Sequence, residues 1–120
     1  MVEFALVAGL FMFILYGLIA FGMILATKQR ITNAAAEGAR AAVGQASSAS
    51  AVSAATARVV SAGLPAGYSP TYTTGSCGVS QCITVTIELN LDANPVIPPA
   101  PGLGLVTPKK IISSAVVQYA

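Results

Sequence analysis

The chain has 120 residues, of which 55% are hydrophobic and 8% are charged, and its formal net charge is +2. The length suits one modest domain, but the charged fraction lies far below the quarter or so that is usual in soluble domains. The six basic residues form no patch interleaved with aromatic side chains, so we expect no nucleic-acid binding. Histidine is absent and the four acidic residues stand far apart along the chain, so we expect neither enzymatic activity nor a cofactor or metal site.

Apolar residues are concentrated at the start of the chain. From Phe4 to Ala26 there are 23 residues without a charge. As a helix they would extend roughly 34 Å, compared with about 30 Å for the hydrocarbon core of a bilayer. A signal-peptide core is much shorter, and no small-residue cleavage site with the right flanks follows this segment. We therefore predict that residues 1–26 form a membrane or filament-core helix, and on these facts alone a single-pass anchor is the simplest interpretation.

Residues 27–62 are rich in alanine and contain no proline, which favours helix throughout. Glu37 and Arg40 lie on a polar face and are spaced for an i,i+3 ion pair. We expect this segment to continue the first helix without a break, to a total of about 90 Å, and to end at Gly63, before Pro65. The opposite face is a stripe of apolar residues at helical spacing: Ile31, Ala35, Ala39, Ala42, Ala46, Ala49, Val52, Ala55 and Val59.

Residues 63–120 change to the two-residue period of strands. The clearest strand is Cys82–Leu91, in which apolar and polar residues alternate, and Ser69–Thr74 and Lys109–Tyr119 are predicted as its neighbours. The apolar loop 92–108 contains a Gly-Leu-Gly-Leu sequence that is either a contact surface or a lid on the sheet. The predicted fold class is α+β, with one long N-terminal helix and a small three-stranded antiparallel sheet packed on the C-terminal half of that helix.

Cys77 and Cys82 are the only cysteines. With no histidine and no further cysteine, a four-ligand zinc site is not expected, and a redox motif would normally have C-x-x-C spacing. The spacing suits a disulfide that closes a small loop and stabilises the fold by roughly 2 kcal/mol. A disulfide would indicate an oxidising space outside the cytosol. Two free thiols are the alternative, which the turn residues between the cysteines make less favourable.

Three stretches resemble a known family. "VEFALV", which opens the apolar helix, "TNAAAEGAR" (Thr32–Arg40) and the ending "IISSAVVQYA" after an apolar loop are similar to TadE-like pseudopilins of the tight-adherence (Flp) type IV pilus system. The most specific of the three is "TNAAAEGAR". The resemblance implies a pilin-like fold, a precursor whose short basic leader is removed by a prepilin peptidase, and extraction from the inner membrane into a helical filament or assembly complex. Pilin-like chains usually carry a glutamate at the fifth mature position, whereas this sequence has Glu3.

Met1, Glu3 and Phe4 are the candidate residues for subunit assembly. In a pilin-like filament, Glu3 would meet the free amine of Met1 on a neighbouring copy. A lone charged side chain costs about 2.5–3.5 kcal/mol at a bilayer centre, and pairing with an ammonium group would remove most of that cost. Because breaking a buried ion pair is expensive, the pair would act as a check on the register of neighbouring subunits. Without the resemblance, a position of Glu3 among the lipid headgroups is the favoured interpretation. The candidates for helix packing are Gly9, Gly17, Gly22, Glu37 and Arg40, although membrane helices also tolerate single glycines without any such role.

The expected function is that of a pilin-like structural subunit, which is inserted in the inner membrane with its C-terminal domain outside. It would then assemble through its N-terminal helix, with the pilus assembly machinery, into an extracellular filament of identical subunits. The small residues of the alanine stripe suit packing against several neighbours. The alternative is a non-polymerising single-pass membrane protein whose outer domain, 63–120, serves as a pilus or secretion assembly component.

The charges beside the apolar segment bear on its orientation. Lys28 and Arg30 follow the segment, so the positive-inside rule taken alone would place the main domain in the cytosol. A disulfide would place that domain outside. Removal of a basic leader would reconcile the two expectations.

Overall fold

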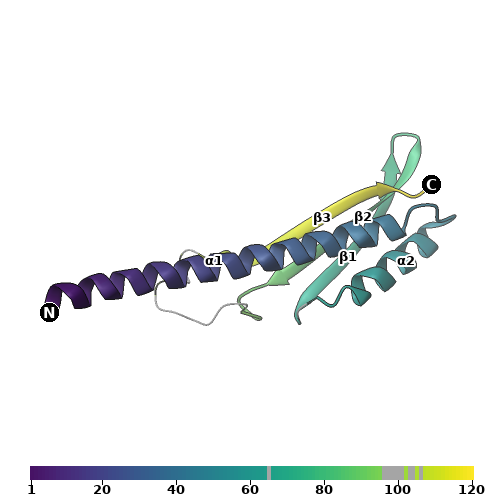
Figure 1. The fold of residues 1–120 in the computed structure, drawn as a ribbon. Coiled ribbons are helices and arrows are strands. Elements are labelled where there is room, and N and C mark those ends of the chain that lie inside the picture. The colour runs from purple at the N-terminus through teal and green to yellow at the C-terminus, as the bar shows by residue number, and fades with distance from the viewer. Residues whose placement is uncertain (65, 96–101, 103–104, 106) are drawn as a thin grey trace.

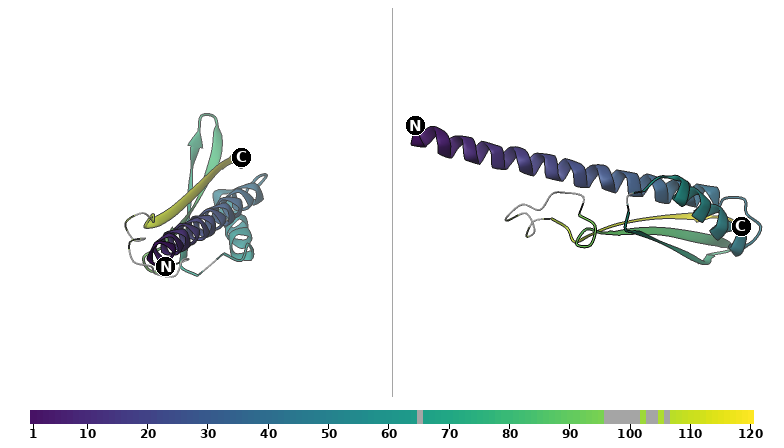
Figure 2. Two further views of the ribbon diagram at one scale, coloured as in Figure 1. Left: turned by 60° about the vertical axis from the view of Figure 1, so that its left-hand side comes forward. Right: turned by 90° about the horizontal axis from the view of Figure 1, so that it is seen from below.

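The computed structural model describes residues 1–64, 66–95, 102, 105 and 107–120. The elements follow one another as α1 (Val2–Ala41), α2 (Ser48–Ser61), β1 (Tyr68–Cys77), β2 (Ser80–Asn90) and β3 (Lys110–Gln118). The molecule is elongated, 72 × 26 × 18 Å, because the first half of α1 extends away from a head formed by the other elements (Figure 1, Figure 2). The predicted α+β fold class, with a long N-terminal helix and a three-stranded antiparallel sheet, is confirmed.

The sheet has β2 at its centre and β1 and β3 as antiparallel neighbours. Successive side chains of a strand point to opposite faces, and the inward-facing residues of β2 are the large core residues of the head. Ile83, Val85, Ile87 and Leu89 have no exposed surface, whereas the residues that alternate with them from Thr84 to Asn90 are half-buried. The second half of α1 and the shorter α2 cover the inner face (Figure 1). The alternation predicted for this strand is confirmed, with its ends shifted by one or two residues.

The prediction of one continuous helix to residue 62 is wrong. The first helix ends at Ala41, and the chain turns back through Gly44, whose φ of 79° lies in the left-handed region that glycine adopts readily. A capping box then starts α2, since the Ser47 hydroxyl accepts from the backbone N–H of Ser50 and the Ser50 hydroxyl accepts from that of Ser47. Residues 27–41 continue the apolar helix, whereas residues 48–61 form a second helix that lies antiparallel to α1 (Figure 1).

Most residues of the alanine stripe pack inside the head and do not form a surface along one extended helix. Ala35, Ala39 and Ala42 are buried in the core of the single chain, so these residues are not available to pack against other copies. Ala46 lies between the two helices and Ala49 in the first turn of α2, and both are exposed, whereas Ala51 is buried in α2. The expected end of the helical region is confirmed, with Gly63 in the left-handed region at φ 63° directly after the C-cap Ala62.

Gly38 lies where α1, α2 and β2 meet. A Cβ added to it would be 2.7 Å from Val59 Cγ2 of α2, 3.4 Å from the Ala55 carbonyl oxygen and 3.6 Å from Val85 Cγ1 of β2. Because real Cβ atoms do not approach carbon at 2.7 Å, the two helices can pack this closely only around a glycine. Sequence reasoning missed this position, although the small residues Ala34 and Ala42 four positions away on either side marked the same face of α1.

The two cysteines close the hairpin between β1 and β2. Both lie within strands, and the turn between these strands consists of Gly78 and Val79. Gly78 has a φ of 70°, as the first central residue of a two-residue hairpin turn requires. The predicted disulfide between Cys77 and Cys82 is present, with the two Cα atoms 5.9 Å apart. It braces an end of the hairpin that projects past the head and exposes Val79 completely (Figure 1). The other loop prediction, for the Gly-Leu-Gly-Leu sequence at 102–105, lies largely outside the described residues.

Candidate membrane and assembly segment

The first half of α1 is an apolar helix with almost no protein around it. The helix as a whole is long and apolar enough to cross a membrane, with a mean hydropathy of 2.5 over its most apolar 18-residue window, and only 6% of that window is buried. Burial in the shared core begins at Ile24. Large apolar side chains that are more than half exposed occur on every side of the segment: Val2, Phe4, Leu6, Val7, Leu10, Phe11, Met12, Phe13, Ile14, Leu18, Ile19 and Leu25.

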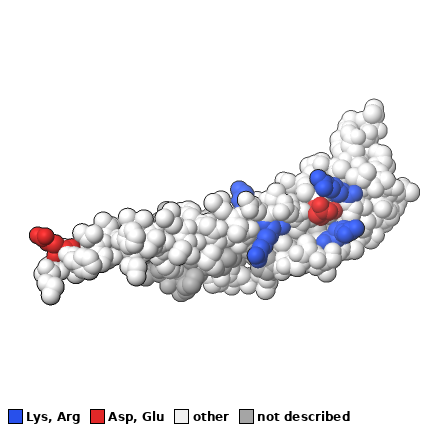
Figure 3. All heavy atoms as spheres, viewed as in Figure 1, with Lys and Arg blue, Asp and Glu red and all other residues white. Residues whose placement is uncertain are grey.

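This apolar surface is expected to be covered by lipid or by another protein surface, because soluble monomers rarely leave a contiguous apolar surface of this size in water. A helix that is apolar all round is typical of a segment surrounded by lipid or by other apolar helices. Figure 3 shows the same separation in charge, with one acidic side chain at the tip of the helix, a long uncoloured stretch, and basic side chains only from the middle of the molecule onward. The first half of α1 is therefore the candidate functional segment.

The predicted assembly residues lie together at the tip of this segment. Met1, Glu3 and Phe4 are all exposed, and among the described residues Glu3 has no ion pair within the chain. Along the same helix, a Cβ added at Gly9, Gly17 or Gly22 would meet nothing within 4 Å. A role of these glycines in helix packing would thus require contacts from outside the chain. Both the assembly role and the packing role stay predictions.

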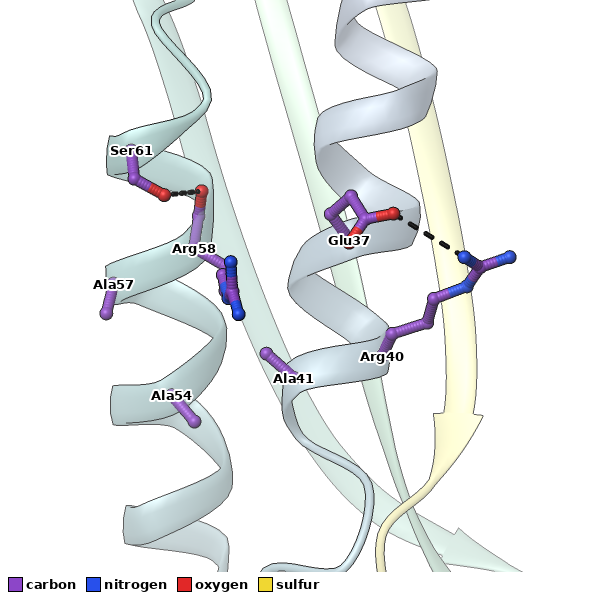
Figure 4. Close-up of a pocket in the computed structure, with 7 residues that line it drawn as sticks. All are labelled: Glu37, Arg40, Ala41, Ala54, Ala57, Arg58 and Ser61. Atoms are coloured by element: carbon purple, nitrogen blue, oxygen red, sulfur yellow. Dashed lines mark hydrogen bonds and ion pairs between the residues drawn. The ribbon is translucent and has the colours of Figure 1, made fainter.

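Glu37 and Arg40 form the predicted i,i+3 ion pair, with Arg40 Nη1 3.5 Å from Glu37 Oε1. Both side chains are mostly exposed, and such surface pairs contribute little to stability. They also line an open groove between α1 and α2, together with Arg58, Ser61 and three alanines. In Figure 4, Arg58 extends from α2 toward α1, whereas Arg40 points away from α2. The pair therefore marks an outer surface of the head, and its predicted part in packing between subunits stays a prediction.

A second ion pair, which the sequence analysis did not predict, lies on the outer face of the sheet. Lys110 Nζ is 2.7 Å from Glu88 Oε1. Asn90 is directly opposite Lys110 in the register of β2 against β3. Glu88, two residues before Asn90, is therefore the diagonal neighbour of Lys110 on the same face of the sheet. The hydrogen bond to Glu88 and the charge of its carboxylate raise the pKa of Lys110 above its ordinary value of 10.5. The register of β2 against β3 was needed to find this pair.

Replacing Glu88 is expected to lower the pKa of Lys110. In the Glu88→Gln variant, an NMR titration of the lysine side-chain signals should show Lys110 losing its proton at a lower pH than in the native chain, whereas Glu37→Gln should leave it unchanged. Since the raised pKa belongs to the folded state, the stabilisation is fully present below the pKa of the unfolded chain. It is lost as pH rises through the raised value. An unchanged Lys110 titration in Glu88→Gln would contradict this assignment.

Taken together, these features define a class: an α+β protein whose bare apolar helix continues into a small head that packs on the second half of the same helix. The model of the family described as TadE-like protein matches residues 1–40 of this chain, which is nearly all of α1 and includes the "TNAAAEGAR" stretch. The resemblance to TadE-like proteins is confirmed over that third of the chain. No curated protein and no solved structure gave a match.

Proposed function

We propose that this protein is a pilin-like structural subunit that is held in the inner membrane by the first half of α1 and then assembles, through that same segment, into an extracellular helical filament. The observation that carries the proposal is the exposed apolar helix, which is similar to TadE-like proteins and which the head leaves uncovered. Both a bilayer and a bundle of identical helices would remove this surface from water.

Glu3 favours the filament over a simple anchor. The carboxylate lies at the far end of the apolar segment from the head, where it has no partner within the described part of the chain. In a bundle of copies, a cationic group of a neighbour would pair with it. A prepilin peptidase and the Tad assembly machinery would be the partners of the precursor and of the membrane form. We propose no catalytic role, since the sequence has no histidine and its four acidic residues are dispersed.

The alternative is a single-pass membrane protein that does not polymerise and serves as a pilus assembly component. It is favoured by the burial of the alanine stripe, because that stripe then offers no packing surface to other copies. Cell fractionation separates the two functions. A filament subunit is expected in material sheared from cells, as ordered polymers by electron microscopy, and an assembly component only in membranes. Recovery of the chain from membranes alone, in cells that carry pili, would overturn the filament proposal.

A further inference from the structure

We propose that four basic residues form a collar that binds the anionic headgroups of a phospholipid bilayer where α1 leaves the membrane. The basic collar consists of Lys28, Arg30, Lys109 and Lys110, four of the six basic residues in the chain. All four are exposed. The inference rests on the proposed membrane insertion of α1 and adds to it a lipid class and the residues that recognise it.

Two segments about 80 residues apart meet at this level of the molecule. Thr32 of α1 and Ser113 of β3 are joined by a hydrogen bond of 2.8 Å between their hydroxyl oxygens. The Thr32 hydroxyl donates to the Lys28 carbonyl oxygen at 2.8 Å, so the Ser113 hydroxyl is the donor between the two. This bond fixes the first half of β3 against the second half of α1.

The geometry of the two elements then gives the level of each cation. β3 runs in the same general direction as α1 (Figure 1). Lys110 precedes Ser113 by three residues, which is about 10 Å along a strand. The same length along a helix takes about seven residues. Lys110 therefore lies level with Leu25 of α1, and Lys109 slightly closer to the N-terminus. Burial of both Ile24 and Ile111 in one core agrees with this alignment.

The collar coincides with the end of the apolar segment. The four cations fall within about 10 Å along α1, which is comparable to the headgroup layer on one side of a bilayer. The uncharged helix before this level, from Phe4 to Gly22, is about 28 Å long and matches the hydrocarbon core. When α1 spans a bilayer, the collar is thus placed among the headgroups, and long basic side chains reach phosphates readily from there.

The charge balance at this level is positive. Glu88 is paired with Lys110, and Asp92 lies close to Lys109 because the Leu91 N–H donates to the Lys109 carbonyl oxygen at 2.9 Å. Four cations against two carboxylates leave an excess of two positive charges. Among the described residues, neither Lys28 nor Arg30 has an ion pair. A lipid that contacts one such cation is expected to be preferred about fivefold when its headgroup is anionic.

The test uses the full chain reconstituted in phosphatidylcholine vesicles. Spin-labelled phosphatidylglycerol and spin-labelled phosphatidylcholine are compared by EPR, which measures how much of each lipid is immobilised at the protein. We expect about a fivefold preference for phosphatidylglycerol at 0.1 M salt. Lys28→Gln/Arg30→Gln should remove most of it, Lys109→Gln should reduce it, and Asp92→Asn should increase it. All of these residues are exposed, so the variants are expected to fold.

The matched control is Arg40→Gln/Arg58→Gln, which removes the same charge from the far end of the head and should leave the preference unchanged. An equal loss in both double variants, or no preference in the native chain, would overturn the collar. Loss of the preference on adding inorganic phosphate at constant ionic strength would overturn it in favour of a site for free anions. Flotation with the vesicles is read separately, and failure to float would instead count against membrane insertion itself.

Discussion

The Glu3→Ala variant is expected to insert in the membrane like the native chain but to be missing from sheared filaments. In the membrane, the substitution removes a charged group that gains nothing from lipid, so insertion is unaffected or slightly favoured. In a helix bundle it would leave the cationic partner of Glu3 buried and unpaired, which typically costs 3–5 kcal/mol. A cost of that size corresponds to a decrease in incorporation of about 100-fold or more.

Two further variants make this experiment specific. Glu37→Ala removes a carboxylate that is exposed on the head and paired with Arg40, and it should enter filaments at the native level. Glu3→Gln keeps the shape of the side chain without its charge, and it should fail like Glu3→Ala if pairing is the cause. The amounts in membranes and in sheared material are compared by immunoblot. Normal filament yield from Glu3→Ala would show that the glutamate has no part in assembly.

The Gly38→Leu variant is expected to lower the free energy of unfolding of the head by about 3 kcal/mol, at the upper end of what overpacking of a core usually costs. The first added atom already lies 2.7 Å from Val59 Cγ2. A leucine would therefore force α2 away from α1 and loosen the shared core with β2. Urea unfolding of the chain in detergent micelles, followed by circular dichroism, gives the free energy.

Gly22→Leu is the matched control, since a Cβ at Gly22 meets nothing within 4 Å and the side chain adds to an already apolar surface. The stability of its head should equal that of the native chain. A second comparison pairs Gly38→Ala with Val59→Ala, which removes the methyl group that the new Cβ strikes. The double variant should lose less stability than the sum of the single variants. Equal effects of leucine at the two glycines would contradict the role of Gly38.

The sheet could be predicted from the sequence because burial of one face imposes a two-residue period that few other structures share. Ile83, Val85, Ile87 and Leu89 alternate with polar residues, and the structure places all four in the core. The apolar half of α1 was equally predictable, since 23 residues without a charge leave few alternatives. In both cases the signal is repeated over many residues, so an error at one position changes little.

The break between the helices was missed because it depends on a few residues that act against a strong average. Alanine-rich composition favours helix over the whole of 27–62, and local signals at Gly44 and Ser47 outweigh it. The packing of Gly38 and the pairing of Lys110 with Glu88 could not be predicted for a different reason. Each depends on which residues of two remote segments become neighbours, and only the three-dimensional register supplies that information.

The position of the core has a consequence for how the molecule moves between surroundings. The core residues of the head run from Ile24 to Tyr119, and none comes from the apolar segment 1–23 that precedes them. Moving this segment from a bilayer into a bundle of apolar helices would therefore break no contact of the head. The proposed passage from a membrane to a filament would therefore leave the core of the head intact.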